Sequence, residues 1–272
     1  MNVLSYGFMR HALLAVIVVG AVAPLIGIYL VQKRLALIGD GLGHVAFAGV
    51  AAGLLAGISP VGVALAFAVV GALGIERLRA SRRAGGDLAL SLFFYGGISA
   101  GVVLASAGGN FNANLLGYLF GSVLTTSHAD LVVVGVLGLV IVGTVYLLAK
   151  ELFATSFDEE AARVSGVPVG LVNGLLAVLV AVTVAVGMRV VGLLMVAALM
   201  VVPVASGRLL ASSFKGTIFA SMAVGVTSGI MGLFLAFYLD FAPGGTIVLV
   251  AIAAYGLVGL RDRLRRRREV FR

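Results

Sequence analysis

The sequence contains no cysteine and no tryptophan, and only 11% of its 272 residues are charged. The absence of cysteine excludes disulfide bonds and thiolate metal sites. A soluble domain of this length rarely has so little charge, and 61% of the residues are hydrophobic, so the composition indicates a polytopic membrane protein. The GxxxxGK[ST] loop that holds nucleotide phosphates and the HExxH motif of zinc proteases are also missing. Neither ATP hydrolysis by such a loop nor zinc-dependent proteolysis by such a motif is therefore expected of this chain.

Apolar runs of about 20 residues, the length that a helix needs to cross a bilayer, recur from one end of the sequence to the other. They predict an all-α fold, a polytopic membrane helix bundle of about nine transmembrane helices (eight or nine). No stretch is typical of a soluble domain, so residues 1–272 are expected to form a single integral-membrane domain. The predicted segments are about 8–31, 36–57, 60–76, 88–107, 129–149, 167–187, 190–209, 216–239 and 244–260.

The basic residues distinguish between the two orientations of such a bundle. With the N-terminus outside, the cytoplasmic loops and the basic tail, residues 261–272, hold all 19 lysines and arginines except Arg10 and Arg189. The positive-inside rule therefore predicts an N-out, C-in topology. These loops account for the net charge of +8, and no nucleic-acid binding is expected because no folded soluble surface carries a basic face. The tail is expected to anchor the orientation and to contact anionic lipid of the bilayer.

The stretch LALIGDGLGHVAFAG, residues 35–49, places Asp40 and His44 inside an otherwise apolar helix. Being four residues apart they share one helical face, while Gly49, Gly53 and Gly57 form a small-residue ridge on the roughly opposite face, where another helix can pack closely. Carboxylate and imidazole are both ligands for divalent cations such as zinc or manganese. Two ligands do not complete a site, but a symmetric dimer would bring two of each together. The alternative is structural: a buried Asp–His hydrogen bond with Asp40 as a helix cap.

The loop KELFATSFDEEAARVSGVP, residues 150–168, is specified more closely than a simple connection requires. Ser156 and Glu159 have the spacing of a capping box, and the acidic triplet 158–160 crowds a first turn, where the helix dipole favours negative charge. Gly166 is placed to end this short helix, and Pro168 prevents its continuation. We predict that the loop (150–166) docks a cytoplasmic partner; the alternative, a helix lying on anionic lipid, is disfavoured by the triplet. The candidate coupling residues are Phe153, Phe157, Asp158, Glu159, Glu160 and Gly166.

A proline and three polar residues are further candidates. Pro203 lies inside an apolar run, where it removes a backbone hydrogen bond, and it is a candidate hinge; ordinary helix packing is the alternative. His128, Asp130 and Asp240 lie at predicted outer ends of helices, where they could attract cations at an entrance or be solvated loop residues. The moderately apolar segment 108–127 is predicted to be an interfacial or re-entrant helix on the outer side.

Four stretches in this order resemble the membrane permease of ATP-binding-cassette (ABC) importers for zinc and manganese. LIGDGLGHVAFAGVA is similar to the family's Gly-Asp-x-x-x-His-x-x-x-x-Gly signature, and LLGYLFGSVLTTSHADL resembles its Leu-Phe-Gly segment. LFATSFDEEAARVSGV resembles the segment that contacts the ATPase, and VVGLLMVAALMVVPVASGRLL, followed by APGGTIVL, resembles the Pro-containing helix. The match runs from about Arg10 to Leu260. The sequence departs from the pattern at Gly43, where a serine or alanine often precedes the histidine; this loosens the backbone and removes neither ligand.

The resemblance implies a type II ABC importer permease: a homodimer of this chain in a prokaryotic cell membrane, with cytoplasmic ATPase subunits and an extracytoplasmic metal-binding protein. It thus implies a transport subunit and not an enzyme, with ATP hydrolysis carried out by a separate ATPase chain. It implies no permanently bound cofactor, and a transported divalent cation, zinc first and then manganese or iron. Asp40 and His44 match the acid and the imidazole of the signature and would hold the ion during ATP-driven alternating access. Two alternatives stay open. A permease for cobalamin or an iron chelate would not need the pair, and a proton-coupled secondary carrier would show inverted repeats and need no ATPase.

Overall fold

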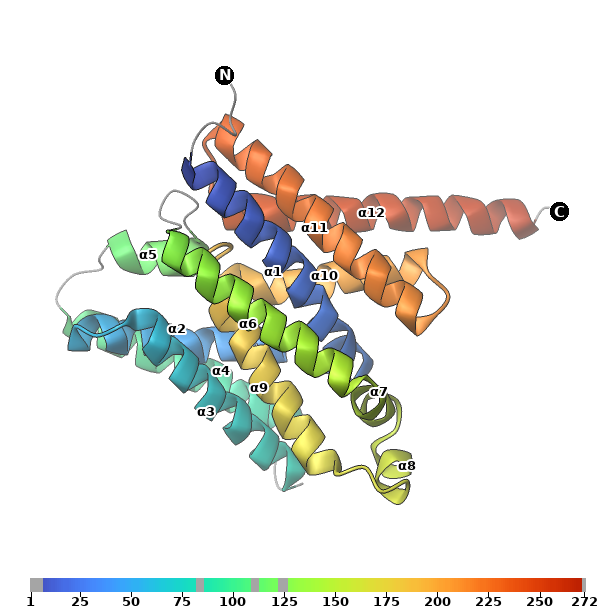
Figure 1. Cartoon of the computed structure of the whole chain (residues 1–272), viewed down its shortest axis with the longest axis horizontal. Coiled ribbons are helices and arrows are strands. Elements are labelled where there is room, and N and C mark those ends of the chain that lie inside the picture. Colours follow the sequence, from blue (N-terminus) through green and yellow to red (C-terminus); the bar gives the residue numbers. More distant parts are fainter. Residues whose placement is uncertain (1–6, 82–85, 109–112, 122–126, 271–272) are drawn as a thin grey trace.

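The computed structural model describes residues 7–81, 86–108, 113–121 and 127–270, and within them the fold is twelve α-helices without a strand (Figure 1). Eight helices are long and apolar enough to cross a membrane, and α10 is a shorter apolar helix. Together they correspond one to one to the nine predicted segments, so the predicted bundle is confirmed. The helices are α1 (Gly7–Gln32), α2 (Ile38–Ala56), α3 (Pro60–Ala80), α4 (Gly86–Ala107), α5 (Ala113–Phe120), α6 (His128–Leu147), α7 (Ala149–Phe157), α8 (Glu159–Val164), α9 (Val169–Gly187), α10 (Leu193–Leu210), α11 (Phe214–Leu239) and α12 (Pro243–Val270).

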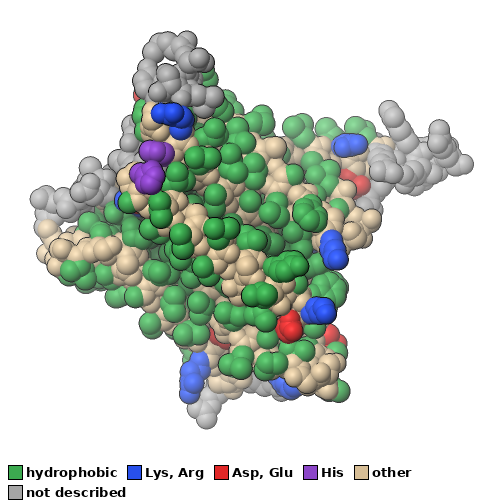
Figure 2. Space-filling view, in the orientation of Figure 1, with side chains coloured by type: hydrophobic (Ala, Val, Ile, Leu, Met, Phe, Trp, Pro, Cys, Tyr) green, Lys and Arg blue, Asp and Glu red, His purple; other side chains and the backbone are tan. Residues whose placement is uncertain are grey.

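Helix α1 runs through the middle of the bundle and contacts α6, α9, α10 and α11. On one side α2 packs against both α3 and α4, and α3 packs on α9; on the other side α10, α11 and α12 pack together (Figure 1). The C-terminal part of α12 projects beyond the other helices (Figure 1). Hydrophobic side chains cover most of the face seen in Figure 2, as expected where lipid is the solvent.

The two ends of the bundle are identified by their short helices. Helices α7 and α8 lie where α1 and α6 end and α9 begins, which we call the α8 end (Figure 1). Helix α5 lies where α6 begins, which we call the α5 end. The structure describes residues 113–121 of the predicted interfacial segment, in which α5 is helical; residues 109–112 and 122–126 of that segment lie outside the described residues, as do Arg82, Arg83 and the last two residues of the tail.

Small residues let helix backbones touch, as the predicted ridge on α2 requires. A methyl group at Gly49 would lie 2.6 Å from Ala64 Cα, and one at Gly53 would lie 2.7 Å from Pro60 Cα, so α2 and α3 are in backbone contact there. Gly57 does not take part. It ends α2 in the left-handed conformation (φ 67°), because its amide and that of the next residue bond to carbonyls of the last turn. The prediction that Gly57 extends the ridge was wrong.

The predicted capping box before α8 was also wrong in its cap residue. Ser156 lies inside α7 and is buried, whereas the Asp158 carboxylate caps α8 by accepting hydrogen bonds from the amides of Glu160 (2.9 Å) and Ala161 (3.0 Å). Two short helices therefore replace the single predicted one, with a corner at Asp158. The predicted end of the helix is correct: Gly166 has φ 85° and closes the last turn of α8, after which α9 begins at Val169.

Candidate metal site and coupling segment

Asp40 and His44 lie on the first two turns of α2. Asp40 is in the first turn, but the residue before the helix is Leu37, and no side chain caps this end of α2. Among the described residues, no side chain hydrogen-bonds or ion-pairs with either Asp40 or His44. The structural alternative, an Asp–His hydrogen bond with Asp40 as cap, is therefore not what the structure contains. Both side chains are half-buried and keep their ligand atoms available.

The start of α2 is held between α4 and α10. On the α4 side, the Phe94 ring lies edge-on to the His44 ring with a centroid distance of 4.3 Å, and Gly97 lies directly against the His44 backbone. On the α10 side, Gly43 faces the Leu193 carbonyl, since a methyl group there would lie 3.1 Å from that oxygen. The glycine that departs from the family pattern is thus a point of close packing on α10. Because backbones meet on both sides, the positions of the two candidate ligands are well defined.

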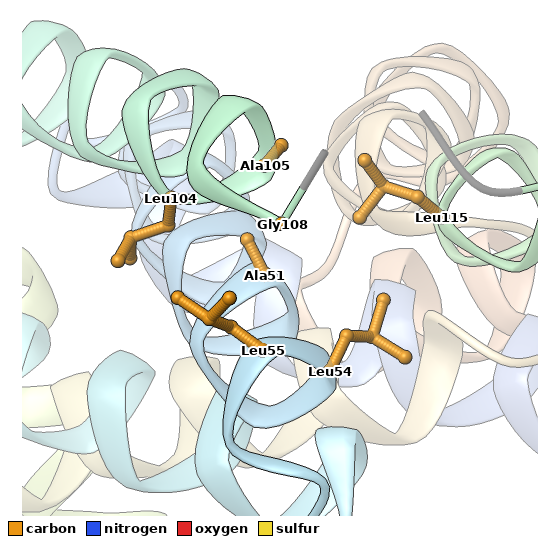
Figure 3. Close-up of a pocket in the computed structure, with 7 residues that line it drawn as sticks. All are labelled: Ala51, Leu54, Leu55, Leu104, Ala105, Gly108 and Leu115. Atoms are coloured by element: carbon orange, nitrogen blue, oxygen red, sulfur yellow. The ribbon is translucent and has the colours of Figure 1, made fainter. Parts of the chain in front are cut away.

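One copy of the chain does not supply a complete set of metal ligands. Among the described residues, no group of three or more His, Asp or Glu side chains is placed to hold a metal ion, and zinc commonly takes four ligands. The pocket in Figure 3 lies at the other end of α2, between α4 and α5, and its lining side chains are all apolar. Its lining offers no side-chain ligand to a cation. The candidate pair can therefore act only as part of a site, completed by water or by another chain.

The two candidate phenylalanines of the coupling segment form an aromatic cluster on α7. Phe153 and Phe157 have ring centroids 4.5 Å apart, and both contact Phe214 at the start of α11, at 4.9 and 6.0 Å. The outer faces of the pair remain open, with 40% of Phe153 and 55% of Phe157 exposed. The cluster therefore joins α7 to α11 and presents an apolar surface at the α8 end. Phe214 was missed in the sequence because it lies 57 residues beyond Phe157.

Glu159 faces into the bundle, although its neighbour Glu160 is exposed. Its carboxylate accepts hydrogen bonds from Lys33 Nζ (2.6 Å) and Asn173 Nδ2 (3.0 Å), and Arg79 Nη2 lies 3.5 Å away. Burial raises the pKa of the Glu159 carboxyl, but the bonded Lys33 ammonium, with smaller contributions from Asn173 and Arg79, holds the pKa below its ordinary value. Burial also lowers the pKa of Lys33, because the attraction of Glu159 compensates only part of the lost hydration. No local pattern in the sequence marks Lys33, Arg79 or Asn173 as partners.

At the α5 end, Asp130 is bound to a residue that was not among the candidates. The Arg189 guanidinium contacts the Asp130 carboxylate at 2.8 and 2.9 Å and lies over the Tyr118 ring, while Asp130 also completes a capping box with Ser127. Its charge is thus already paired. His128 is exposed, and its ring packs edge-on against the ring of His11, near the start of α1, with 6.0 Å between the centroids.

Asp240 and Pro203 lie away from the candidate metal site. Asp240 is exposed, has φ 55° and ends α11. Pro203 is buried inside α10, a helix that continues on both sides of it, and it leaves the Leu199 carbonyl without its helical amide partner. A second proline inside a helix, Pro24 in α1, was not singled out in the sequence. The missing hydrogen bond at Pro203 weakens α10 at this point. A hinge needs such a weak point, but a helix in ordinary packing also tolerates one.

The fold defines a polytopic membrane protein, and one of its closely packed helices carries a carboxylate and an imidazole, Asp40 and His44, that are candidate metal ligands. The chain belongs to the ABC 3 transport family, whose model matches residues 5–260. It is 37% identical over 256 residues to a metal transport system membrane protein of Treponema pallidum (94% of this chain, 96% of that protein). It is 30% identical over 256 residues to the manganese transport system membrane protein MntC of Halalkalibacterium halodurans (94% and 88%).

The chain is also similar to a solved structure and to relatives whose names give iron or zinc. The structure of PsaBC from Streptococcus pneumoniae in complex with Fab matches with a TM-score of 0.85 and 28% identity, covering 94% of this chain and 92% of that one. Relatives from Haemophilus influenzae are named for iron and for zinc. The predicted resemblance is confirmed, and the chain is the membrane permease of a metal-ion ABC transporter.

Proposed function

We propose that this permease imports a divalent metal ion into the cytoplasm by ATP-driven alternating access. It does so as a homodimer, together with separate cytoplasmic ATPase subunits and an extracytoplasmic protein that delivers the ion. Zinc is the first expected cargo, followed by manganese and iron. Intrinsic affinity does not decide among these metals, because selectivity comes from the geometry of the site and from the delivering protein. The observation that carries the proposal is the pair Asp40 and His44, which lies on α2 of a metal-transport permease and makes no side-chain hydrogen bond or ion pair among the described residues.

The pair binds the ion in transit and is not a permanent cofactor site. One carboxylate and one neutral imidazole give two ligands, and the same pair from the second copy would raise the number to four, which suits zinc. Close packing of α2 on α4 and α10 presets the positions of the ligands, and a change in that packing would change their separation. Pro203 in α10 is the proposed flexing point, because α10 packs directly against the start of α2.

The distribution of charge supports the predicted N-out, C-in orientation in a prokaryotic plasma membrane. At the α8 end, Lys33 contacts α7 and α8, and Arg208 Nη2 donates to Gln32 Oε1 at 2.9 Å. These contacts gather basic loops at one end, which would be cytoplasmic by the positive-inside rule. The tail, residues 261–272, would extend from the same side. At the opposite end His128 and Asp240 are the proposed entrance residues, because the charge of Asp130 is already paired with Arg189.

The coupling segment, residues 150–166, is the proposed contact with the ATPase. The exposed rings of Phe153 and Phe157 offer the apolar surface, Asp158 and Gly166 set the two ends of α8, and Glu160 points to solvent. Phe157→Ala should weaken co-purification of the ATPase subunits, because an aromatic anchor commonly dominates an interface. Phe219→Ala, at a phenylalanine of α11 that is 70% exposed and whose ring is not part of the cluster, is the control and should leave co-purification unchanged.

The ion site is tested by ATP-dependent uptake of radioactive zinc and manganese by the reconstituted complex. Asp40→Asn and His44→Gln should each reduce uptake at least about tenfold, because losing even a supporting group at a metal site costs that much. Asp87→Asn is a matched control, since Asp87 also lies in the first turn of a membrane helix and is exposed. Normal uptake by both site variants, with ATP hydrolysis still dependent on metal, would show that the ion passes elsewhere.

A further inference from the structure

Lys33 connects the α8 end to the helix that carries the candidate metal ligands. It follows α1 directly, and its Nζ donates to the Thr155 carbonyl of α7 at 2.7 Å and to Glu159 Oε1 of α8 at 2.6 Å. The lysine side chain is only 4% exposed, whereas Glu159 is 41% exposed. A lysine is almost never buried to this extent unless it is paired. The lysine is therefore bound to the coupling segment by two specific hydrogen bonds and not by loose surface attraction.

The carboxylate of Glu159 is the centre of a wider network at the same place. Asn173 of α9 donates to it at 3.0 Å, and Arg79 of α3 lies within 3.5 Å of it and within 3.4 Å of Glu76. Residues from α3, α8, α9 and the end of α1 thus meet at one acidic side chain. Ile38, the first residue of α2, lines the same small cavity as Lys33. Any displacement of α8 must move this network or break it.

The turn between Lys33 and α2 is a rigid, hydrogen-bonded corner. Arg34 has the left-handed φ of 60°, its amide donates to the Val31 carbonyl at 3.2 Å, and the Leu35 amide donates to the Leu30 carbonyl at 2.8 Å. This is the bonding pattern of a Schellman turn. The Ile38 amide then donates to the Leu35 carbonyl at 3.0 Å, at the start of α2. Lys33 is therefore joined to the turn that holds Asp40 by five residues of hydrogen-bonded backbone.

We propose that Lys33 is a positioning residue that transmits movement of α7 and α8 to the first turn of α2. The inference rests on the proposed function, in which α7 and α8 contact the ATPase and Asp40 and His44 hold the ion. It gives Glu159 a different role from its neighbours in the coupling segment. Glu159 anchors the segment inward on Lys33, while the exposed aromatic pair on α7 faces the ATPase. Rotation of the coupling segment after ATP binding would pull on Lys33 and so shift Asp40 relative to α10.

The proposal is tested in the reconstituted permease–ATPase complex by counting ions transported per ATP hydrolysed. Lys33→Met keeps the length of the side chain but loses both hydrogen bonds, and Glu159→Gln keeps an acceptor but loses the charge. Both should lower the number of ions per ATP about fivefold or more, with ATPase assembly and ATP hydrolysis retained. The double variant should be no worse than either single variant, because the two residues act through one contact. Lys215→Met, an exposed lysine at the same end, and Asp87→Asn should leave the ratio unchanged.

Three results would overturn the proposal. The first is an unchanged ratio of ions to ATP in both variants. The second is a loss of uptake that only parallels a loss of ATPase assembly or of thermal stability, because Lys33 would then be merely structural. The third is additive losses in the double variant. Glu159→Gln provides the decisive test if Lys33→Met does not fold. Failure here remains distinct from failure of the proposed function, because Asp40→Asn would still abolish uptake while Lys33→Met transported normally.

Discussion

Replacing Gly97 of α4 with alanine should separate α4 from α2 at His44. The added methyl group would lie 2.6 Å from Val45 N, 2.7 Å from His44 C and 2.9 Å from His44 O. Ordinary contacts are about 3.5–4.0 Å, so the two helices would have to move apart by about 1 Å. All three atoms belong to backbone, and no side chain can rotate away to relieve the contact. Overpacking of this kind typically costs about 1–3 kcal/mol.

The neighbouring glycine provides a control on the same helix. A methyl group at Gly96 would have no atom within 4 Å, so Gly96→Ala should change stability by no more than about 0.5 kcal/mol. For a loss of about 2 kcal/mol, Gly97→Ala should lower Tm by about 4–8 °C. The measurement is thermal unfolding in detergent, followed by the helical circular dichroism band because the chain has no tryptophan.

Metal uptake gives a second readout of the same change. A functional site must hold its groups within about 0.5 Å of the productive geometry, and the expected shift of His44 is about twice that, so uptake should fall more steeply than Tm. Equal Tm values for Gly97→Ala and Gly96→Ala would refute the reasoning, since they would show that α4 and α2 are not in backbone contact at His44. Reduced uptake by Gly97→Ala at a Tm equal to that of Gly96→Ala would also contradict the reasoning, because the loss of uptake would then not come from separating the two helices.

Three further predictions concern the two ends of the bundle. Gly166→Ala should destabilise the protein by about 1–2 kcal/mol, because alanine is strained at φ 85°, while Gly170→Ala in an open helical position should be nearly neutral in the same melting experiment. A double-mutant cycle of Asp130→Asn and Arg189→Gln should give a coupling of about 1 kcal/mol; additive effects would contradict the pair. The lowered pKa of Glu159 means that its stabilisation is complete above the ordinary carboxyl pKa of about 4.3 and is lost as the pH falls through the lower folded value. The protection factors of the α8 amides, which correct for the pH dependence of intrinsic exchange, should therefore stay constant from neutral pH to about pH 4 and fall only below it, and Glu159→Gln should remove that acid transition.

The fold class followed from features that are local in the sequence. Hydrophobic runs long enough to span a bilayer marked the eight long apolar helices of the described residues and the shorter α10, because a backbone in lipid must satisfy its hydrogen bonds within the helix. The spacing of Asp40 and His44 placed them on one face of α2, since helical periodicity alone decides that. Gly166 was correctly predicted as a helix end, because the left-handed residue that closes a helix is commonly glycine.

Predictions from local sequence failed where two roles were open to one residue, or where two residues were candidates for one position. Gly57 has the spacing of a packing ridge and the chemistry of a helix terminator, and the end of α2 decided in favour of the terminator. Ser156 and Asp158 both qualified as the cap of α8, and the corner between α7 and α8 placed Asp158 at the cap position. Each choice depends on where the chain turns, which the neighbouring helices determine.

The sequence by itself determined the membrane class, the helices and the two candidate ligands, because these depend on composition and on periods of a few residues. Only the tertiary structure decided which charged side chains meet. Lys33 and Glu159 are 126 residues apart, and Asp130 and Arg189 are 59 apart, so no repeat or motif connects them. Their pairing depends on the tilt and crossing of α1, α6 and α9, which arise from side-chain packing between helices. The contact that joins α8 to the end of α1 is therefore a property of the folded bundle.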